Sequence, residues 1–267
     1  MAACTEVVNL EVDQKDIDLL VVDGSITNDT MEHMIRLTMA GNYFLNQPAE
    51  KVSGAIVTVS EGDNTFLFSE KTVGSGEYYS EPDVYGIPGR TYQLSISLPE
   101  PVNGTTQYSA VCKMETINPV DSIGLKRWDD IGINGFYEVK IYVLDPPETN
   151  FYSFRTILNS RLLTDTITEL FITDDRLYNG NYTNGIGVQF FDQSNPDETF
   201  HSGDTVTLVT SSITRSYYQF LIAVQTETSP KVPLFSGPPA NAAGNISNGA
   251  VGFFTAYSNA YAKIIVP

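Results

Sequence analysis

The chain has 267 residues, 42% of them hydrophobic, so it is long enough for one large or two ordinary domains with a proper core. Charged residues make up only 18%, and a chain rich in Thr, Asn and Tyr is typical of β proteins with solvated faces. The net charge of −17 argues against nucleic acid as a partner and against direct contact with an anionic membrane surface.

The first four residues, MAAC, raise the question of where the protein resides. The two cysteines, Cys4 and Cys112, are too few for a disulfide framework. Small residues directly before a cysteine are typical of the end of a bacterial lipoprotein signal, after which the cysteine carries the lipid. An accidental cysteine is an equal alternative from these four letters alone. Residues 1–16 are polar and predict a tether, in which Cys4 is the candidate lipidation site.

Residues 17–120 predict an antiparallel β-sandwich. The runs VSGAIVTVS and TFLFSEK are joined by a hairpin-like turn, EGDN. In the run TYQLSISL, Tyr92, Leu94, Ile96 and Leu98 alternate with polar residues, as in a half-buried strand. The stretch around Cys112 alternates too, so this cysteine is expected to be a small core residue. Strands about 8–12 residues apart with turns between them favour a small sandwich.

Residues 121–267 predict a second β-rich, barrel-like domain with one late helix. The segment 116–135 holds Pro, several Gly and the single tryptophan, and it interrupts the strand pattern near the predicted boundary at residue 120. The run SSITRSYYQFLIAVQ predicts a helix over 214–227, capped by Ser212 or Thr214 and stopped by Pro230. Strands are expected over 136–143, 150–160, 163–175, 186–194 and 204–212, and two closing strands over 249–258 and 260–267.

The loop RLYNGNYTNGIG is the candidate ligand-binding segment. Tyrosine offers a flat apolar face with a polar tip, and asparagine adds amide donors and acceptors, a combination that suits sugars and peptides. A solvated loop with a tyrosine packed beneath it is the structural alternative. The candidate ligand-binding residues are Tyr178, Asn179, Asn181, Tyr182 and Asn184.

No residue pattern predicts catalysis, a metal site or a cofactor. His33 and His201 lie in different predicted domains, and the chain has no G-x-S-x-G elbow and no Cys/His cluster. Asp174 and Asp175 are the best candidate carboxylate pair for glycoside hydrolysis, or with neighbouring Asn for calcium. A turn that ends a strand explains these two residues better.

Several motifs occur together in one order: CTEVV, LLVVDGSITND, VSGAIVTVSEGD, GIPGRTYQLSI, NPVDSI and GNISNGAVGFFTAYS. In this respect the chain resembles a family of Bacteroides-type outer-membrane lipoproteins of unknown function, usually encoded beside SusCD-like TonB-dependent transporters. The resemblance implies an N-terminal transthyretin-like or carboxypeptidase-regulatory-like (Ig-like) sandwich and a second β-rich domain. It also implies a lipidated cysteine, which maps onto Cys4, and it brings no catalytic residues. The absence of a signal peptide before Cys4 departs from the family and is expected if a leader has been removed.

We therefore expect an accessory lipoprotein of the outer membrane, exposed at the cell surface and touching the membrane only through its lipid anchor. Its expected partners are a SusCD-like TonB-dependent transporter complex and a peptide or oligosaccharide ligand. A lipid-anchored hydrolase that acts on the imported substrate is one alternative. A structural or adhesive surface lipoprotein is another.

Overall fold

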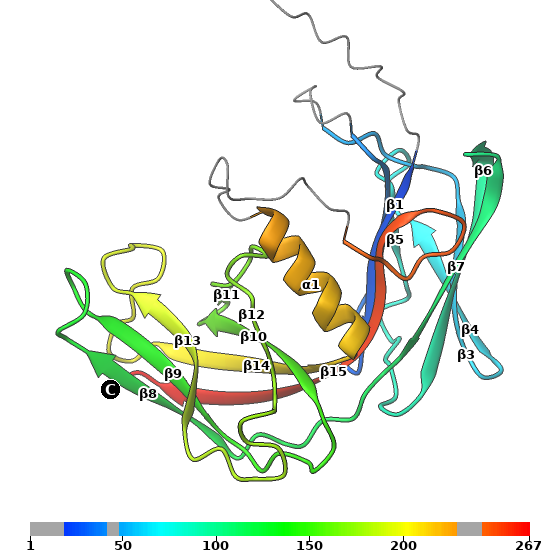
Figure 1. Ribbon diagram of the computed structural model, residues 1–267. Coiled ribbons are helices and arrows are strands. Elements are labelled where there is room, and N and C mark those ends of the chain that lie inside the picture. Colours follow the sequence, from blue (N-terminus) through cyan, green and yellow to red (C-terminus); the bar gives the residue numbers. More distant parts are fainter. Residues whose placement is uncertain (1–18, 42–47, 229–241) are drawn as a thin grey trace, which may run out of the picture.

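The computed structural model describes residues 19–41, 48–228 and 242–267, and this part of the chain is nearly all β with one late helix, as predicted (Figure 1). Its strands form two sheets. The elements are β1 (Leu20–Thr27), β2 (Met34–Met39), β3 (Ile56–Glu61), β4 (Asn64–Glu70), β5 (Glu77–Tyr79), β6 (Thr91–Val102), β7 (Thr105–Lys113), β8 (Ser122–Trp128), β9 (Phe136–Tyr142), β10 (Phe151–Leu158), β11 (Arg161–Leu162), β12 (Phe171–Asp174), β13 (Ile186–Asp192), β14 (Thr205–Ile213), α1 (Arg215–Thr228) and β15 (Val251–Ile265).

One sheet of 12 strands runs through both predicted domains. Its order is β11-β10-β14-β15-β1-β2-β5-β4-β3-β6-β7, and β12 pairs with β10 off this path. β1 and β15 run parallel and lie side by side in Figure 1, with Val21 opposite Val251 and Thr27 opposite Tyr257. The large sheet therefore contains strands that precede residue 120 and strands that follow it. The domain boundary at residue 120 stays a prediction.

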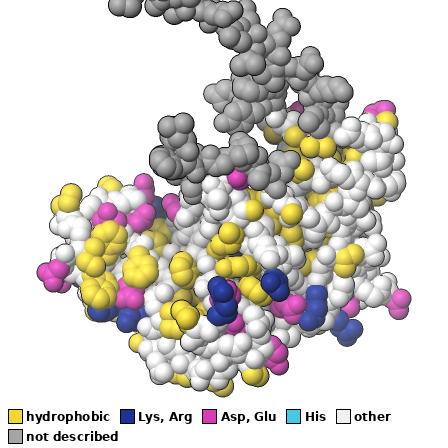
Figure 2. Space-filling model, viewed as in Figure 1, with side chains coloured by type: hydrophobic (Ala, Val, Ile, Leu, Met, Phe, Trp, Pro, Cys, Tyr) yellow, Lys and Arg dark blue, Asp and Glu magenta, His cyan; other side chains and the backbone are white. Residues whose placement is uncertain are grey.

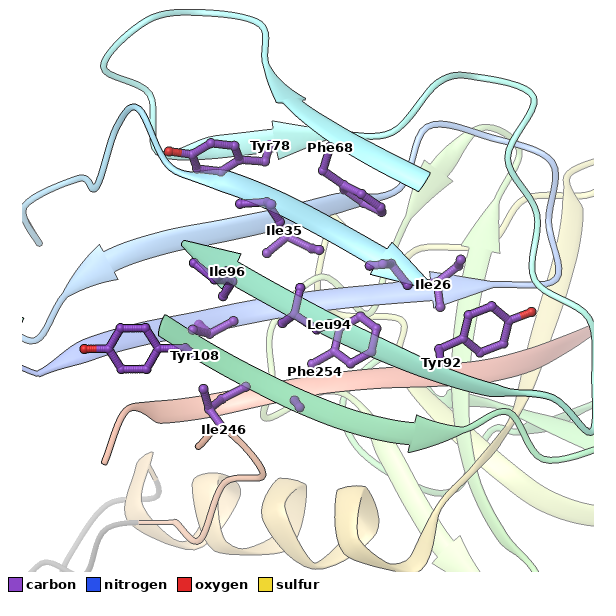
Figure 3. Packing of buried hydrophobic residues seen from close by; sticks show 14 of the residues in the cluster. Ile26, Ile35, Phe68, Tyr78, Tyr92, Leu94, Ile96, Tyr108, Ile246 and Phe254 are labelled. Atoms are coloured by element: carbon purple, nitrogen blue, oxygen red, sulfur yellow. The ribbon is translucent and has the colours of Figure 1, made fainter. Parts of the chain in front are cut away.

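The first hydrophobic core lies inside the N-terminal half of this sheet, which curls so that β7 comes back beside β15 (Figure 3). On β6 the side chains of Tyr92, Leu94, Ile96 and Leu98 are all buried, which confirms the predicted alternation. The thiol of Cys112 on β7 is buried too and accepts the backbone N–H of Ala256 at 3.2 Å. Burial raises the pKa of this thiol, as expected for a small core residue.

The second core lies between the two sheets. The small sheet has the order β13-β9-β8, and its buried Val139 and Ile141 join Phe154 of β10 and Leu208 of β14 in one cluster. Along β10 and β14, side chains two residues apart share a face, so the even-numbered residues of these strands turn toward this core. The odd-numbered residues of the same strands face the opposite side of the large sheet.

α1 packs on that opposite side. Thr214 caps it as predicted, because its Oγ1 accepts the N–H of Tyr217 at 3.3 Å. Leu221 of α1 and Ile213 of β14 are buried against each other in a small third cluster. β14 is thus covered on both faces, and this explains why its residues after Thr205 are all buried. The predicted stop at Pro230 lies outside the described residues.

Three predicted elements differ from the structure. The segment 116–135 contains a strand, β8, where a break in the pattern was expected. The two closing strands are a single strand of 15 residues, β15, because Ser258–Ala260 stay paired with β14. The predicted strand 163–175 is wrong over its first half: the Glu169 carboxylate accepts the N–H of Thr166 at 3.1 Å and closes a turn.

Candidate functional site

A pocket opens on the face of the large sheet that α1 only partly covers. Its cavity volume is about 430 Å³, within the range of small-molecule sites. Its walls come from β1, β10, β14, β15 and the first turn of α1, with the segment 29–34 and Leu162 of β11. We call it the sheet-face pocket, and its charged, amide and aromatic lining includes Asp23, Asp29, Arg155, Tyr217, Tyr257, Asn259 and Tyr261.

Strand register brings these side chains together. On β15 the period of two places Tyr257, Asn259 and Tyr261 on one side of the sheet. Tyr261 lies opposite Val209 of β14, and Val209 lies opposite Arg155 of β10. Neighbouring strands are about 4.8 Å apart, so the Cα atoms of Arg155 and Tyr261 are about 10 Å apart across the pocket. A span of this size suits a small polar ligand.

Asp29, two residues beyond β1, forms one wall of the pocket. Its Oδ2 accepts hydrogen bonds from Asn259 Nδ2 and Tyr261 Oη, both at 2.7 Å, and from Thr27 Oγ1 at 3.2 Å. The adjacent Asn28 exchanges two bonds with the backbone of Asn259, at 3.1 and 2.6 Å, and so extends the parallel pair beyond β1. These bonds hold the carboxylate in one position relative to β15.

Tyrosine rings form the apolar part of the pocket. Tyr217, at the start of α1, packs against Phe253 of β15 with ring centroids 5.0 Å apart, and burial raises the pKa of its hydroxyl. Tyr261 is 47% exposed and lines the pocket. Partial burial raises its pKa, and the bond to Asp29 raises it further. Both hydroxyls are therefore protonated at neutral pH, and the rings are neutral.

Arg155 brings positive charge into the pocket. Its side chain is partly buried and interacts with the Tyr257 hydroxyl, and Tyr217 and Tyr261 lie close enough to influence it. Burial opposes the charge on the guanidinium, whereas the neighbouring tyrosines, Tyr257 first, raise the pKa of Arg155. An arginine is in any case protonated at all physiological pH values.

The two histidines have different surroundings. His33, at the edge of the pocket, is buried: its Nδ1 accepts the N–H of Thr27 at 3.4 Å, and its Nε2 lies 3.2 Å from the Val84 carbonyl. Burial lowers the pKa of His33, so the ring is neutral and carries its proton on Nε2. His201 is exposed beyond β13 and lies 3.5 Å from Asp204.

The predicted ligand loop does not converge on a cavity of useful size. Tyr178 points inward and lines a cavity of about 20 Å³, room for about one water molecule. The side-chain amides of Asn181 and Asn184 donate to backbone carbonyls two residues earlier, at 2.9 and 3.2 Å, and stabilise turns. Asn179 is partly exposed, and the ring of Tyr182 is 40% exposed. The ligand-binding role of these five residues stays a prediction.

The carboxylates next to this loop have different environments. Asp174 forms an ion pair with Arg176 at 2.8 Å, whose hydrogen bonds lower the pKa of the Asp174 carboxyl. Asp175 is fully buried and accepts the N–H of Asn150 at 2.7 Å. A third carboxyl, Asp145, is buried near Asp175, and burial followed by the nearby charge raises its pKa. The side chains of Asp174 and Asp175 therefore do not share one open cleft as a hydrolytic pair would.

Tyr178 belongs to this buried group. Its pKa is raised to about 12 by burial and by the nearby carboxylates of Asp145 and Asp175. Tyr152 donates its hydroxyl to Asp145 Oδ1 at 2.8 Å, and the backbone N–H of Gly180 donates to Asp145 Oδ2 at 3.2 Å. These bonds fix the loop to β10 and give the buried carboxyl a structural role.

Within the described ranges, no three His, Cys, Asp or Glu side chains are grouped so that they would hold a metal ion. The described part of the chain also contains no helix with the length and apolarity to span a bilayer. Cys4 lies outside the described residues, so its lipidation stays a prediction.

A hydrophobic patch covers part of the small sheet, which is seen at the left of Figure 2. Phe190 of β13 is 55% exposed, and Trp128 of β8 is partly exposed with Lys126 Nζ 3.2 Å from its ring centroid. Phe190 also lines a cavity with Ile222 and Gln225 of α1, and neither Phe190 nor Trp128 lines the sheet-face pocket.

None of the sequence patterns described above predicted the sheet-face pocket. The signal that was available is the period-two series Tyr257, Asn259, Tyr261 in the final strand. Its partners were not readable, because the bond between Asn28 and Asn259 joins residues 231 positions apart. Arg155 gave no signal of its own within the run NFYSFRTILNS.

Comparisons with known proteins place the chain in a family. No curated protein matches the chain. A solved structure of a candidate carbohydrate-binding protein from Bacteroides uniformis ATCC 8492 is 11% identical, with a TM-score of 0.17, over 73% of this chain and 89% of that chain. A family model described as a domain of unknown function, DUF4249, matches residues 5–262. The chain therefore belongs to the DUF4249 family.

Proposed function

We propose that this protein binds a small polar ligand, a glycan or a peptide, in the sheet-face pocket. The observation that carries the proposal is the meeting of three chemistries in one cavity: the guanidinium of Arg155, the carboxylate of Asp29 and the exposed ring of Tyr261. All three are held by strands or by hydrogen bonds to strands, so the site is preformed. Ligand orientation comes from the polar groups, and contact area comes from the rings.

The same geometry favours binding over catalysis. A general base needs a lone pair that is free to take a proton. Both ring nitrogens of His33, the histidine at the edge of the pocket, have partners, so this side chain has no free lone pair for that role. The alternative of a hydrolase predicts that a bound oligosaccharide is cleaved, whereas the binding proposal predicts that it is recovered intact.

A second part of the proposal concerns where the protein is located and which protein it binds. We propose that Cys4 carries a lipid at the outer membrane and that the protein is an accessory subunit of a SusCD-like TonB-dependent transporter. The support is the small residues before Cys4 and the resemblance of the motifs quoted above. Anchoring would raise the local concentration of the protein beside its partner, so even a weak contact would be effective.

The pocket is tested by calorimetric titration with a panel of oligosaccharides and short peptides. Tyr261→Ala is expected to weaken binding about tenfold, because it removes the exposed ring and one bond to Asp29. Tyr85→Ala is the matched control, since Tyr85 is 53% exposed and lies outside the pocket. If Tyr182→Ala abolishes binding and Tyr261→Ala leaves it intact, the ligand site is the predicted loop and the proposal is wrong.

The anchor and partner are tested in membranes. The chain is expressed behind a lipoprotein signal, extracted in mild detergent and purified by a C-terminal tag. The proposal expects an intact mass that includes acyl chains, their loss in Cys4→Ser, and a TonB-dependent transporter among the copurified proteins. An acyl-free mature protein would refute the anchor, and a native transporter complex that lacks the protein would refute the partner.

A further inference from the structure

Arg155 differs from the other partly or fully exposed arginines of the described chain. Five of them form ion pairs with carboxylates: Arg36, Arg90, Arg127, Arg161 and Arg176. Arg215 is exposed at the start of α1, where water solvates its charge. Arg155 is partly buried in the sheet-face pocket, and no carboxylate of the described residues lies within 4.0 Å of its side-chain nitrogens.

A cation that is withdrawn from water normally has a partner that compensates its charge. The side-chain hydrogen bond of Arg155 goes to a hydroxyl, that of Tyr257, and not to a carboxylate. A guanidinium has five N–H donors in a planar fork that matches the two oxygens of a carboxylate. The pocket therefore offers a place for one anionic group at its β10 side, and the bound group would replace the missing partner.

The opposite side of the pocket favours hydrogen-bond donors and disfavours anions. Asp23, Asp29 and Glu32 place acceptor oxygens there, and Glu32 also bonds to Lys71. Both polar atoms of the Asn259 amide are engaged, because its Nδ2 donates to Asp29 and its Oδ1 accepts the hydroxyl of Ser211 at 2.6 Å. A second anion would be repelled by this wall, whereas hydroxyl groups can donate to it.

The anion-binding side at Arg155 and the acceptor-lined side opposite to it together favour some classes of ligand over others. A peptide backbone presents as many carbonyl acceptors as N–H donors, and its carbonyls would find few donors opposite Arg155. A sugar acid presents a single carboxylate and a ring of hydroxyl donors, and its apolar ring face fits the exposed ring of Tyr261. The distance of about 10 Å between the Cα atoms of Arg155 and Tyr261 leaves room for both contacts.

We propose that the sheet-face pocket binds a uronic-acid-containing saccharide, with the sugar carboxylate on the guanidinium of Arg155, its hydroxyls toward Asp29 and a sugar ring on Tyr261. This inference rests on the proposed function and narrows it to one ligand class. It makes Arg155 the residue that distinguishes acidic from neutral saccharides.

The test is calorimetric titration with disaccharides that carry one galacturonate or one glucuronate residue. Two comparison sets are the same sugars after carboxyl reduction, which are neutral, and tripeptides with free or amidated C-termini. Binding of an acidic sugar is expected to weaken at least tenfold on carboxyl reduction and to fall with added salt. Arg155→Gln is expected to cause a loss of about 10- to 100-fold, and Arg155→Lys, which keeps the charge without the fork, a smaller one.

Arg215→Gln is the matched control, because it also removes an arginine without an ion pair in the described chain but lies outside the pocket. Far-UV circular dichroism and the melting temperature establish that each variant is folded. Equal affinity for acidic and reduced sugars, lost in Tyr261→Ala, would overturn the inference and leave the proposed function standing. Binding of free peptide carboxylates alone would overturn the saccharide assignment. No binding of any probe to the folded protein would overturn both.

Discussion

Gly252 controls the parallel contact between β1 and β15, and its replacement by alanine gives a sharp test of that contact. Gly252 lies opposite Val22 in the pair and has φ of +96°. A Cβ atom added to it would be 2.0 Å from the carbonyl oxygen of Val22, where real Cβ atoms essentially never come closer than 3.0 Å. The obstacle is backbone within a strand, so no side chain can rotate away.

The cost has two parts. An L-residue at this positive φ costs about 1–2 kcal/mol. Relief of the overlap requires β1 and β15 to separate by about 1 Å, and this weakens two ladder hydrogen bonds worth about 1 kcal/mol each and loosens the core beneath them. We therefore expect Gly252→Ala to lower the free energy of unfolding by about 3–5 kcal/mol, or the melting temperature by about 10 °C.

The matched control is Gly249→Ala. Gly249 also has a positive φ, +77°, but its added Cβ would have no atom within 4 Å, so only the backbone part of the cost, about 1 kcal/mol, is expected. The assay is urea denaturation followed by far-UV circular dichroism, with the slope m compared between variants. If Gly252→Ala and Gly249→Ala agree within about 1 kcal/mol at equal m, the close approach of β1 to β15 is refuted.

Three further predictions concern hydrogen bonds and buried ionisable groups. Tyr261→Phe removes the hydroxyl that donates to Asp29 and is expected to lower the free energy of unfolding by about 1 kcal/mol, or the melting temperature by about 2–4 °C. The control Tyr85→Phe is expected to leave both quantities unchanged. Equal effects of the two substitutions would contradict the prediction. His33 has a lowered pKa in the folded state, so the unfolded chain binds more protons than the folded one, and the free energy of unfolding is expected to fall as pH drops below 6.5. His33→Gln is expected to make the free energy of unfolding less dependent on pH in this range. An unchanged pH dependence would show that other groups cause it. Asp145 has a raised pKa in the folded state, so the stability that its protonated form contributes is lost as pH rises through that pKa. The stability of Asp145→Asn relative to wild type is therefore expected to be greater at pH 7 than at pH 4.5. A difference that stays constant between these pH values in urea titrations would argue against a buried charge.

Local patterns in the sequence were enough for most of the fold. The alternation of Tyr92, Leu94, Ile96 and Leu98 reflects a strand with one buried face, and the cap at Thr214 marks the start of the helix. Both signals lie within a few residues of what they predict. β8 was missed because its neighbours in the chain are Gly, Pro and Asp, while its pairing partner β9 supplies the stability.

The candidate site was less predictable because its geometry depends on long-range pairing. Asp29 looks like a turn residue until β1 is placed beside β15, and Arg155 looks like an exposed strand residue until α1 and Tyr257 surround it. The polar loop around Tyr178 had the right composition for a binding site, but its amides are used to close turns. Composition alone does not reveal which polar groups are already engaged by their own backbone.

The parallel pair between β1 and β15 also affects how the chain reaches its folded state. Val21 and Val251 become neighbours only after nearly all the intervening residues have been synthesised. Contacts between residues so far apart in the sequence form slowly. Until β15 pairs with β1, one edge of β1 has no native partner. The nascent polypeptide on the ribosome is therefore most open to aggregation in the interval before β15 emerges.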